Sequence, residues 1–320
     1  MIKVASLFAG VGGICQAFKD LGCEITYANE FDEKACQTYR SIYQEKYGEE
    51  CKFLEHKDVR EVDASSLPDF NILTGGFPCQ SFSIAGERKG LGDDRGNLFF
   101  EIERILREKK PDAFLLENVK NLAGHDNGKT LGIILSVLDG LGYSVKCQVL
   151  NSMKHGNIPQ NRERIFIIGF LDENKTNLFS FPDEIPLTKT IRDIIDKDRK
   201  EDRYYYGEGC HYTKYNDRLH LIKNPNTVYQ IRRGMYIRDN KQNVCPTLTA
   251  NMGSGGHNVP LIIDNFGIRK LTPNECFAFQ GFDNFNKPEG MSDGHLYKQA
   301  GNSVTIDVVK RIAENMIEVL

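Results

Sequence analysis

The sequence predicts an α/β fold, with a mixed but mostly parallel sheet and a smaller, irregular β-rich domain. Over residues 2–170, short apolar runs typical of buried strands alternate with segments whose apolar residues have helical spacing. Polar or glycine-rich loops follow several of these apolar runs. From residue 204 to about 266 the alternation stops, and the chain becomes aromatic, glycine-rich and prone to form strands.

Local patterns predict the individual elements of the larger domain. The apolar run 2–7 predicts the first strand, and Ile14, Phe18 and Leu21 give segment 12–21 the apolar spacing of a helix. Asp32 is a suitable N-cap for the second helix. By the same criteria we expect further strands at 24–29, 53–54, 72–74, 113–116, 145–150 and 165–170, and helices at 32–47, 98–110, 131–141 and 305–320.

The composition is that of an ordinary globular protein. The 320 residues are 40% hydrophobic and 27% charged, and the net charge of -3 decides nothing about partners. The sequence holds no apolar run that approaches the roughly 20 residues needed to cross a bilayer. Nine scattered cysteines without a CxxC pair fit a reducing cytoplasm and argue against disulfides or a metal site. We expect Cys23, Cys147 and Cys276 to be packed among apolar neighbours.

The chain length suggests two domains. We expect the larger to comprise 1–180 and to be completed by 290–320, with the smaller at 181–289. Segment 204–270 carries nine basic and four acidic side chains, a net charge of +5, which leaves -8 for the remainder. Such a basic module predicts a polyanionic partner, although a merely solvated surface would have the same charge.

The loop after the first strand has the features of a cofactor-binding loop. Gly10 and Gly12 allow close approach of a ligand, and the following helix N-terminus favours negative charge. Glu30, about 20 residues on, is placed to bind a ribose, and Phe31 is placed to stack on an adenine. Asp58 could accept from the adenine amino group. Cys15 occupies the position of the last glycine of the dinucleotide fingerprint, which argues against a nicotinamide cofactor. The glycine loop and the two acids at successive strand ends together predict an adenosine-containing cofactor.

Two strand ends carry reactive side chains. Cys79 follows the strand at 72–74 within a glycine-rich loop, where a thiol could act as a nucleophile. Glu117 ends the strand at 113–116. In the alternative reading, Cys79 is an inert buried thiol and Glu117 caps a helix or pairs structurally with Arg164. Carboxyl ends of neighbouring parallel strands meet at one edge of a sheet, so we expect one active site there.

Six motifs together make the chain resemble the cytosine-5 DNA methyltransferases of bacterial restriction-modification systems. They occur in that family's order and cover nearly the whole sequence. The motifs are Phe8-Ala9-Gly10-Val11-Gly12, Pro78-Cys79-Gln80, Glu117-Asn118-Val119, Gln160-Asn161-Arg162-Glu163-Arg164, Arg269-Lys270-Leu271-Thr272-Pro273-Asn274-Glu275 with Gln280-Gly281-Phe282, and Gly301-Asn302-Ser303-Val304.

The resemblance implies a Rossmann-like S-adenosylmethionine-dependent fold and a small target-recognition domain at 181–289. It assigns Cys79 as the thiolate that adds to C6 of a flipped-out cytosine and Glu117 to the N3 and N4 edge of that base. Arg164 would bind O2, and Arg162 would support the same pocket. S-adenosylmethionine would contact Phe8, Gly10, Gly12, Glu30, Phe31, Asp58, Val59, Pro78, Asn302, Ser303 and Val304.

The implied partner is double-stranded DNA, acted on by a monomer, with a separate cognate endonuclease. The residues expected to contact the DNA are Arg232, Arg233, Thr247, Leu248, Gly253 and Gly255. Three alternatives are an RNA cytosine-5 methyltransferase, a catalytically silent DNA-binding protein and a nicotinamide oxidoreductase. The sequence itself does not specify the recognition site.

Overall fold

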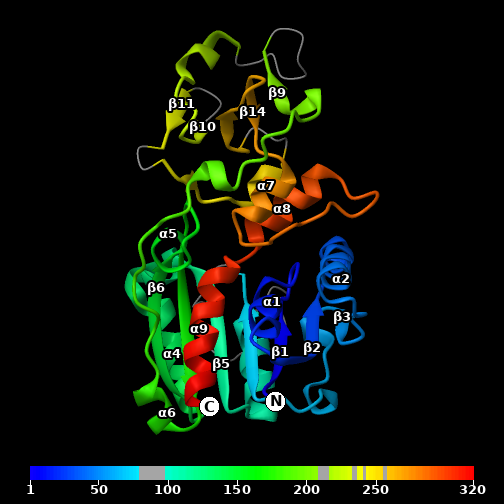
Figure 1. Ribbon diagram of the computed structural model, residues 1–320. Helices are drawn as coiled ribbons and strands as arrows, with labels where there is room; N and C mark the ends of the chain where they lie inside the picture. Colours follow the sequence, from blue (N-terminus) through cyan, green and yellow to red (C-terminus); the bar gives the residue numbers. More distant parts are fainter. Residues whose placement is uncertain (79–97, 208–215, 233–235, 241–242, 255–257) are drawn as a thin grey trace. The chain divides into compact units, whose positions relative to one another are not determined.

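The computed structural model describes residues 1–78, 98–207, 216–232, 236–240, 243–254 and 258–320. The chain divides into two compact units (Figure 1). Unit 1 consists of 1–150, 163–183 and 309–320, and unit 2 of 151–162 and 184–308. The predicted roles of the two sequence-defined domains, catalysis and target recognition, stay predictions. No helix in these described ranges is long and apolar enough to cross a membrane.

Unit 1 is built on a seven-stranded sheet, which confirms the predicted α/β class. Its first five strands in spatial order are parallel, and β8 joins them antiparallel to β5, so the sheet is mixed. In spatial order the strands are β3 (Leu54–His56), β2 (Glu24–Glu30), β1 (Lys3–Leu7), β4 (Ile72–Gly76), β5 (Ala113–Val119), β8 (Glu163–Phe170) and β6 (Ser144–Asn151).

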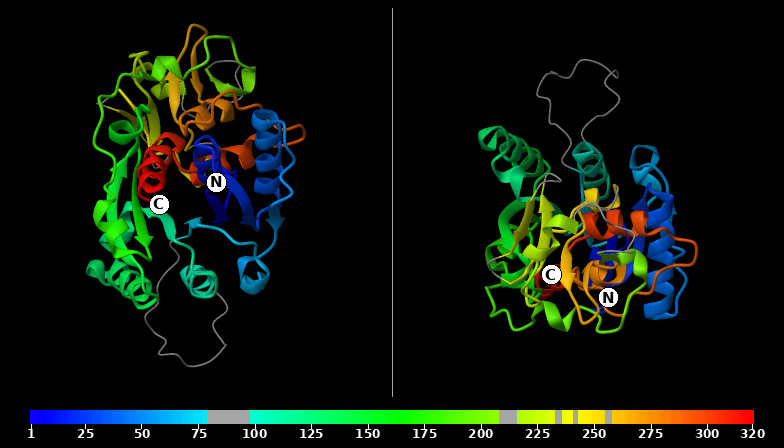
Figure 2. Two further views of the ribbon diagram at one scale, coloured as in Figure 1. Left: turned by 60° about the horizontal axis from the view of Figure 1, so that its bottom comes forward. Right: turned by 90° about the horizontal axis from the view of Figure 1, so that it is seen from above.

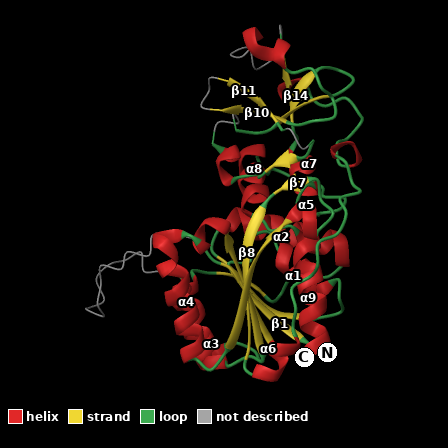
Figure 3. Ribbon diagram, turned by 90° about the vertical axis from the view of Figure 1, so that its left-hand side faces the viewer, coloured by secondary structure: helices red, strands yellow, loops and turns green. Residues whose placement is uncertain are grey.

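Helices cover both faces of this sheet. Figure 3 shows α3 and α4 on one face and α1 and α9 on the other. Asp32 caps its helix as predicted, because its side chain accepts from the backbone N–H groups of Lys34 and Ala35. The helices with residues in unit 1 are α1 (Gly13–Lys19), α2 (Glu33–Tyr47), α3 (Phe99–Lys109), α4 (Lys129–Gly140), α6 (Glu173–Leu178) and α9 (Ile306–Val319).

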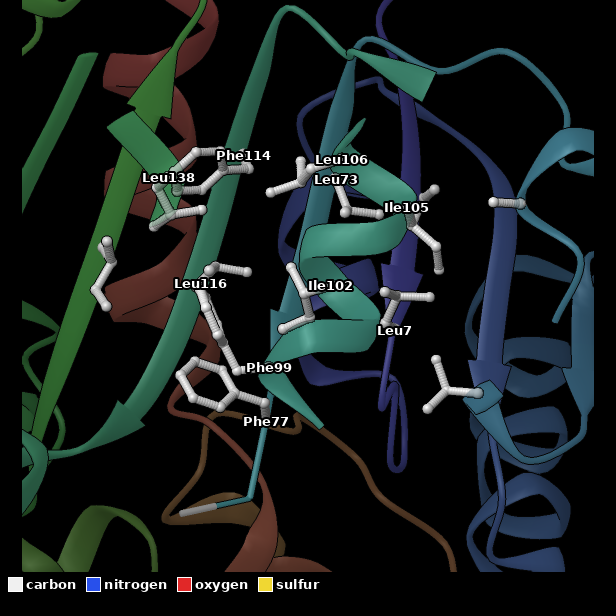
Figure 4. Close-up of a cluster of buried hydrophobic side chains, with 14 of the residues drawn as sticks. Leu7, Leu73, Phe77, Phe99, Ile102, Ile105, Leu106, Phe114, Leu116 and Leu138 are labelled. Carbon is white, nitrogen blue, oxygen red and sulfur yellow. The ribbon is translucent and has the colours of Figure 1, made fainter. Parts of the chain in front are cut away.

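Apolar packing fixes α3 against the sheet. Ile102 and Ile105 are fully buried and belong to one cluster with Leu7, Leu73 and Leu116 of the three central strands (Figure 4). Burying each such side chain contributes roughly 1.5–3 kcal/mol. This cluster therefore holds together the strands whose carboxyl ends carry the predicted active-site residues.

The strand order changes direction between β1 and β4, which makes this the switch point of the sheet. The pairing register aligns Leu7 with Gly75 and Gly76 with Glu117. Both chain termini lie at the end of unit 1 that is away from the carboxyl ends of β1, β4 and β5 (Figures 1 and 2). The predicted strand 113–116 was too short, because pairing with β8 continues to Val119 and places Glu117 inside β5.

Unit 2 holds a five-stranded antiparallel sheet, more regular than the predicted irregular domain. Its order is β11 (Tyr236–Asp239), β10 (Tyr229–Arg232), β13 (Leu261–Ile263), β14 (Ile268–Lys270) and β9 (Tyr205–Tyr206). Tyr229, Ile231 and Leu261 form its small core. The described residues of unit 2 also include a parallel pair of strands, β7 (Gln160–Asn161) and β12 (Cys245–Pro246), and the α-helices α5 (Ser152–His155), α7 (Pro273–Ala278) and α8 (Asp293–Asn302).

Candidate active site

The loop between β1 and α1 has a backbone that suits glycine. Phe8, Gly10 and Gly12 have φ values of +53°, +57° and +88°. Phe8 is partly buried on the core of unit 1, and Gly12 is the N-cap of α1. A bulky residue such as Phe8 rarely adopts a positive φ, and strained backbone of this kind is often found at functional sites.

Gly12 also lies against an aromatic ring. A Cβ at this position would stand 2.7 Å from Cε2 of Tyr39, whose ring is buried. We therefore expect Gly12→Ala to lower the free energy of unfolding by more than about 1 kcal/mol, because the positive φ and the clash add. Gly22→Ala is the matched control, since Gly22 has φ +83° but nothing within 4 Å of its added Cβ.

Urea unfolding of both variants would measure this difference. Equal destabilisation by Gly12→Ala and Gly22→Ala would show that the Tyr39 ring does not shape the loop.

The carboxylate of Glu30 is tied to this loop. It accepts hydrogen bonds from the backbone N–H of Gly10 at 2.8 Å, of Phe31 at 3.0 Å and of Asp32 at 2.8 Å. The neighbouring Phe31 ring is 70% exposed, which is unusual for a phenylalanine and suits a stacking surface. The structure thus brings together three of the residues predicted to bind the cofactor.

Asp58 and Val59 follow β3 with different environments. The Asp58 side chain accepts from the Arg60 backbone and is paired with the Arg60 guanidinium, and these hydrogen bonds lower the pKa of its carboxyl. The Val59 side chain is buried in the core of unit 1. A ligand would therefore reach Val59 through its backbone, and Asp58 would have to share its oxygens with Arg60.

Glu117 and Arg164 form an ion pair near the carboxyl end of β5. Arg164 Nε lies 3.0 Å from Glu117 Oε1, and Glu117 is only 9% exposed. Across the sheet, a Cβ on Gly76 would stand 3.4 Å from Glu117 Oε2, so the glycine leaves room for the carboxylate. The structural pairing considered from the sequence is present. The Glu117 carboxylate also lies beside β4, the strand that leads to Cys79.

Asn118 fixes the chain that leaves β4. Its side-chain amide Nδ2 donates to the carbonyl of Phe77 at 2.9 Å, and it is 2% exposed. Pro78 follows and is exposed. Cys79, the predicted nucleophile, lies outside the described residues, as do 80–97. The described part of the site therefore ends one residue before the thiol.

Arg162 is buried, and backbone carbonyls surround its guanidinium. It is 2% exposed, and its guanidinium donates to the carbonyls of Leu248 at 2.8 Å, Gly301 at 3.1 Å and Ser303 at 2.5 Å. All four residues belong to unit 2, whereas Arg164 belongs to unit 1. The predicted support of the catalytic pocket by Arg162 stays a prediction.

The Gly301–Val304 motif joins α8 to α9. Gly301 is required by close packing, because an added Cβ would stand 2.1 Å from the carbonyl carbon of Thr249. Asn302 ends α8 and is exposed, rather than capping the next helix, and Ser303 and Val304 are buried. The exposed amide of Asn302 is thus the group of this motif best placed to meet a ligand.

Unit 2 contains a groove of about 780 Å³. Thr247, one of the residues predicted to contact DNA, lines it and donates its hydroxyl to the Asn161 carbonyl at 2.7 Å. Leu248 is buried beneath it, and Gly253 packs against Gly294. The groove is lined by Asn161, Val228, Gln230, Ile231, Arg238, Asp239, Asn240, Pro246, Thr247, Thr249, Asn251 and Asn258.

Sequence reasoning missed Gln230 and Arg238. They are directly opposed on β10 and β11, whereas the alternate residues Tyr229 and Ile231 enter the core. Alternation of apolar and polar residues along 229–232 was the available signal. The Arg232 side chain, Arg233 and Gly255 lie outside what the structure describes.

The described cysteines form no disulfide. Cys23 and Cys276 are buried as expected, whereas Cys147 is exposed on β6, so the expectation for it was wrong. Burial raises the pKa of the Cys15 thiol. Among the described residues, no group of three His, Cys, Asp or Glu could hold a metal ion.

Comparisons with known proteins show to which family the sequence is similar. A family model described as C-5 cytosine-specific DNA methylase matches residues 2–318. The chain is 51% identical to the Type II methyltransferase M.Bsp6I of Bacillus sp. (strain RFL6), over 99% of this chain and 98% of that protein. It is 35% identical to the Type II methyltransferase M.HhaI of Haemophilus parahaemolyticus, over 98% and 94%.

Solved structures agree on the fold. The crystal structure of the S. pombe Dnmt2 methyltransferase matches with a TM-score of 0.73 and 20% identity, covering 99% of each chain.

Proposed function

Because this chain belongs to the family of C-5 cytosine-specific DNA methylases, we propose that it transfers a methyl group from S-adenosylmethionine to C5 of a cytosine in a short duplex sequence. Its relatives named as Type II methyltransferases support a role as the modification enzyme of a restriction-modification system. The observation that carries the proposal is the Glu117 carboxylate, held by Arg164 beside the strand that leads to Cys79.

The residues would act on the cytosine in a defined order. The Cys79 thiolate adds to C6, and the electron pair of the C5–C6 double bond moves to give an enamine with a nucleophilic C5. Glu117 holds N3 in a protonated, hydrogen-bonded state and accepts from the N4 amino group, which draws electron density away from C6 and favours this addition. Arg164 stabilises the charge that develops on O2. After C5 accepts the methyl group, a water or hydroxide takes the C5 proton and the Cys79–C6 bond breaks, which restores the double bond and the thiolate.

The loop around Glu30 fits an adenosine-type methyl donor. Its carboxylate is oriented by three backbone N–H groups and can still accept from ribose hydroxyls, and the exposed Phe31 ring can stack on an adenine. Bound there, S-adenosylmethionine would supply an electrophilic methyl group on its sulfonium. Gly10 and Gly12 would allow the loop backbone to approach it closely.

The polar groove of unit 2 favours duplex DNA as the substrate. Amide, hydroxyl and guanidinium groups such as Gln230, Thr247 and Arg238 line it, and these groups read base edges and contact phosphates. The target cytosine must leave the helix to reach the thiol, at a cost of a few kcal/mol.

Bisulfite sequencing of DNA from an expressing host tests the reaction and reveals the recognition sequence. A duplex with 5-fluorocytosine at the identified position should then form a stable covalent adduct in the presence of S-adenosylmethionine, because C5 has no proton to lose. Peptide mapping should locate the adduct at Cys79 and not at the exposed Cys147. Unmodified duplex DNA, together with methylation of RNA, would replace the proposal by the RNA alternative. Methylation without an adduct would remove the covalent step.

A further inference from the structure

The buried Arg162 joins two segments that are far apart in the sequence. Its guanidinium donates to Leu248 O on one side and to Gly301 O and Ser303 O on the other. The side chain lies at the end of β7 and is 2% exposed. A guanidinium presents up to five donors in a fixed fork, so it fits several carbonyls only when they keep one relative placement.

The first of these segments, 246–251, lines the groove proposed to receive DNA. It is attached to β7 by two further contacts. Thr247 donates to the carbonyl of Asn161, and the Leu248 N–H donates to the side-chain Oε1 of Gln160 at 3.1 Å. Thr249, which lines the groove, is therefore adjacent to Leu248, whose backbone is hydrogen-bonded to Arg162 and Gln160.

The second segment is the Gly301–Val304 motif, proposed to contact the cofactor. Gly301 packs directly on the backbone of Thr249, as the 2.1 Å approach of an added Cβ indicates. Gln280 strengthens the same junction, because its side chain donates to Ala300 O at 2.7 Å and accepts from Gln160 Nε2 at 3.3 Å. Segment 246–251 and the Gly301–Val304 motif are thus in backbone contact, and Arg162 is hydrogen-bonded to both.

We propose that Arg162 is a positioning residue that couples the binding of duplex DNA in the unit 2 groove to the binding of the methyl donor at Gly301–Val304. This inference rests on the proposed function. A shift of 246–251 on DNA binding changes the hydrogen-bond geometry of a buried cation, and leaving such a cation without its acceptors is costly. A shift of 246–251 therefore also shifts the carbonyls of Gly301 and Ser303. By linkage, binding of the methyl donor changes the affinity for DNA by the same factor.

Calorimetric titration with S-adenosylhomocysteine, with and without a duplex carrying the identified site, tests this coupling. In the wild-type protein, DNA should tighten S-adenosylhomocysteine binding by about 5- to 150-fold. In Arg162→Lys this factor should fall to near one, because an ammonium group cannot span both segments as the planar fork does. The factor itself is the readout, since a merely structural loss would weaken binding equally with and without DNA.

Arg269→Lys is the matched control. Arg269 is also a fully buried arginine of unit 2, but its partners are the carboxylates of Asp264 and Glu275 and not the carbonyls of Leu248, Gly301 and Ser303. The Arg269→Lys variant should have a less stable unit 2 but the same coupling factor as the wild-type protein.

Hydrogen exchange of the wild-type protein provides a test that does not require a stable variant. Duplex DNA alone should slow exchange in peptides covering 298–304. Unchanged exchange there, or an undiminished coupling factor in Arg162→Lys, would overturn the inference, and so would the absence of coupling in a wild-type protein that binds both ligands. Failure of the wild-type protein to bind S-adenosylhomocysteine or to methylate DNA would instead overturn the proposed function on which it rests.

Discussion

Replacing Glu117 by glutamine should lower kcat for DNA methylation by about 10²- to 10³-fold, the loss typical of removing one preorganised polar group from a transition state. Glutamine keeps the size of the side chain and one oxygen that can accept from Arg164 Nε, which lies 3.0 Å from Oε1. It cannot hold a proton at N3 of the cytosine. The addition of the Cys79 thiolate should therefore slow, while the fold and the cofactor loop remain intact.

Single-turnover rates with labelled methyl donor would measure the effect on chemistry, and calorimetry with S-adenosylhomocysteine would measure the effect on binding. Glu163→Gln is the matched control, because Glu163 lies on the adjoining strand β8 and pairs with exposed Lys120 at 2.9 Å. Exposed pairs contribute little, so this variant should behave as wild type. A rate loss below tenfold in Glu117→Gln would exclude Glu117 from the chemical step.

The larger domain could be predicted well because its strands are nearly continuous apolar runs. The fully buried Val4, Leu73 and Phe114 come from such runs, and each marks a strand of the parallel sheet. The boundary at Glu117 could not be predicted, because only pairing with β8 extends β5 to Val119. Register with a strand almost 50 residues away has no local signal in the sequence.

The pairing of Arg164 with Glu117 was one of the alternatives that the sequence offered, and the structure contains it. The surroundings of Arg162, which is buried, could not be predicted from the sequence. The Arg162 guanidinium donates to backbone carbonyls of residues 86 to 141 positions away. The partners depend on tertiary packing, which no window of the sequence contains.

Replacing Arg269 by alanine should lower the local stability of unit 2 by about 3–5 kcal/mol, the cost of breaking a buried ion pair from one side. Arg269 is fully buried, and its guanidinium donates to Asp264 Oδ2 and to both carboxylate oxygens of Glu275. Glu275 also accepts from the Thr272 N–H at 2.7 Å and so closes the capping box of α7. Without the guanidinium, two carboxylates remain in a dry interior, and the sheet loses its connection to α7.

Native-state hydrogen exchange measures the local stability of unit 2 in this variant. Amides of β14 and α7 should exchange about 10²- to 4 × 10³-fold faster in Arg269→Ala, since each 1.4 kcal/mol corresponds to a factor of ten. Arg199→Ala removes an exposed arginine that pairs with Asp202 and lies over the Tyr205 ring, and it should change the same rates by less than about fivefold. Slow exchange preserved in Arg269→Ala would mean that unit 2 is held by its apolar core alone. In that case Asp264 and Glu275 would have to acquire protons or water without opening the sheet, and replacing both with apolar residues should then stabilise the protein.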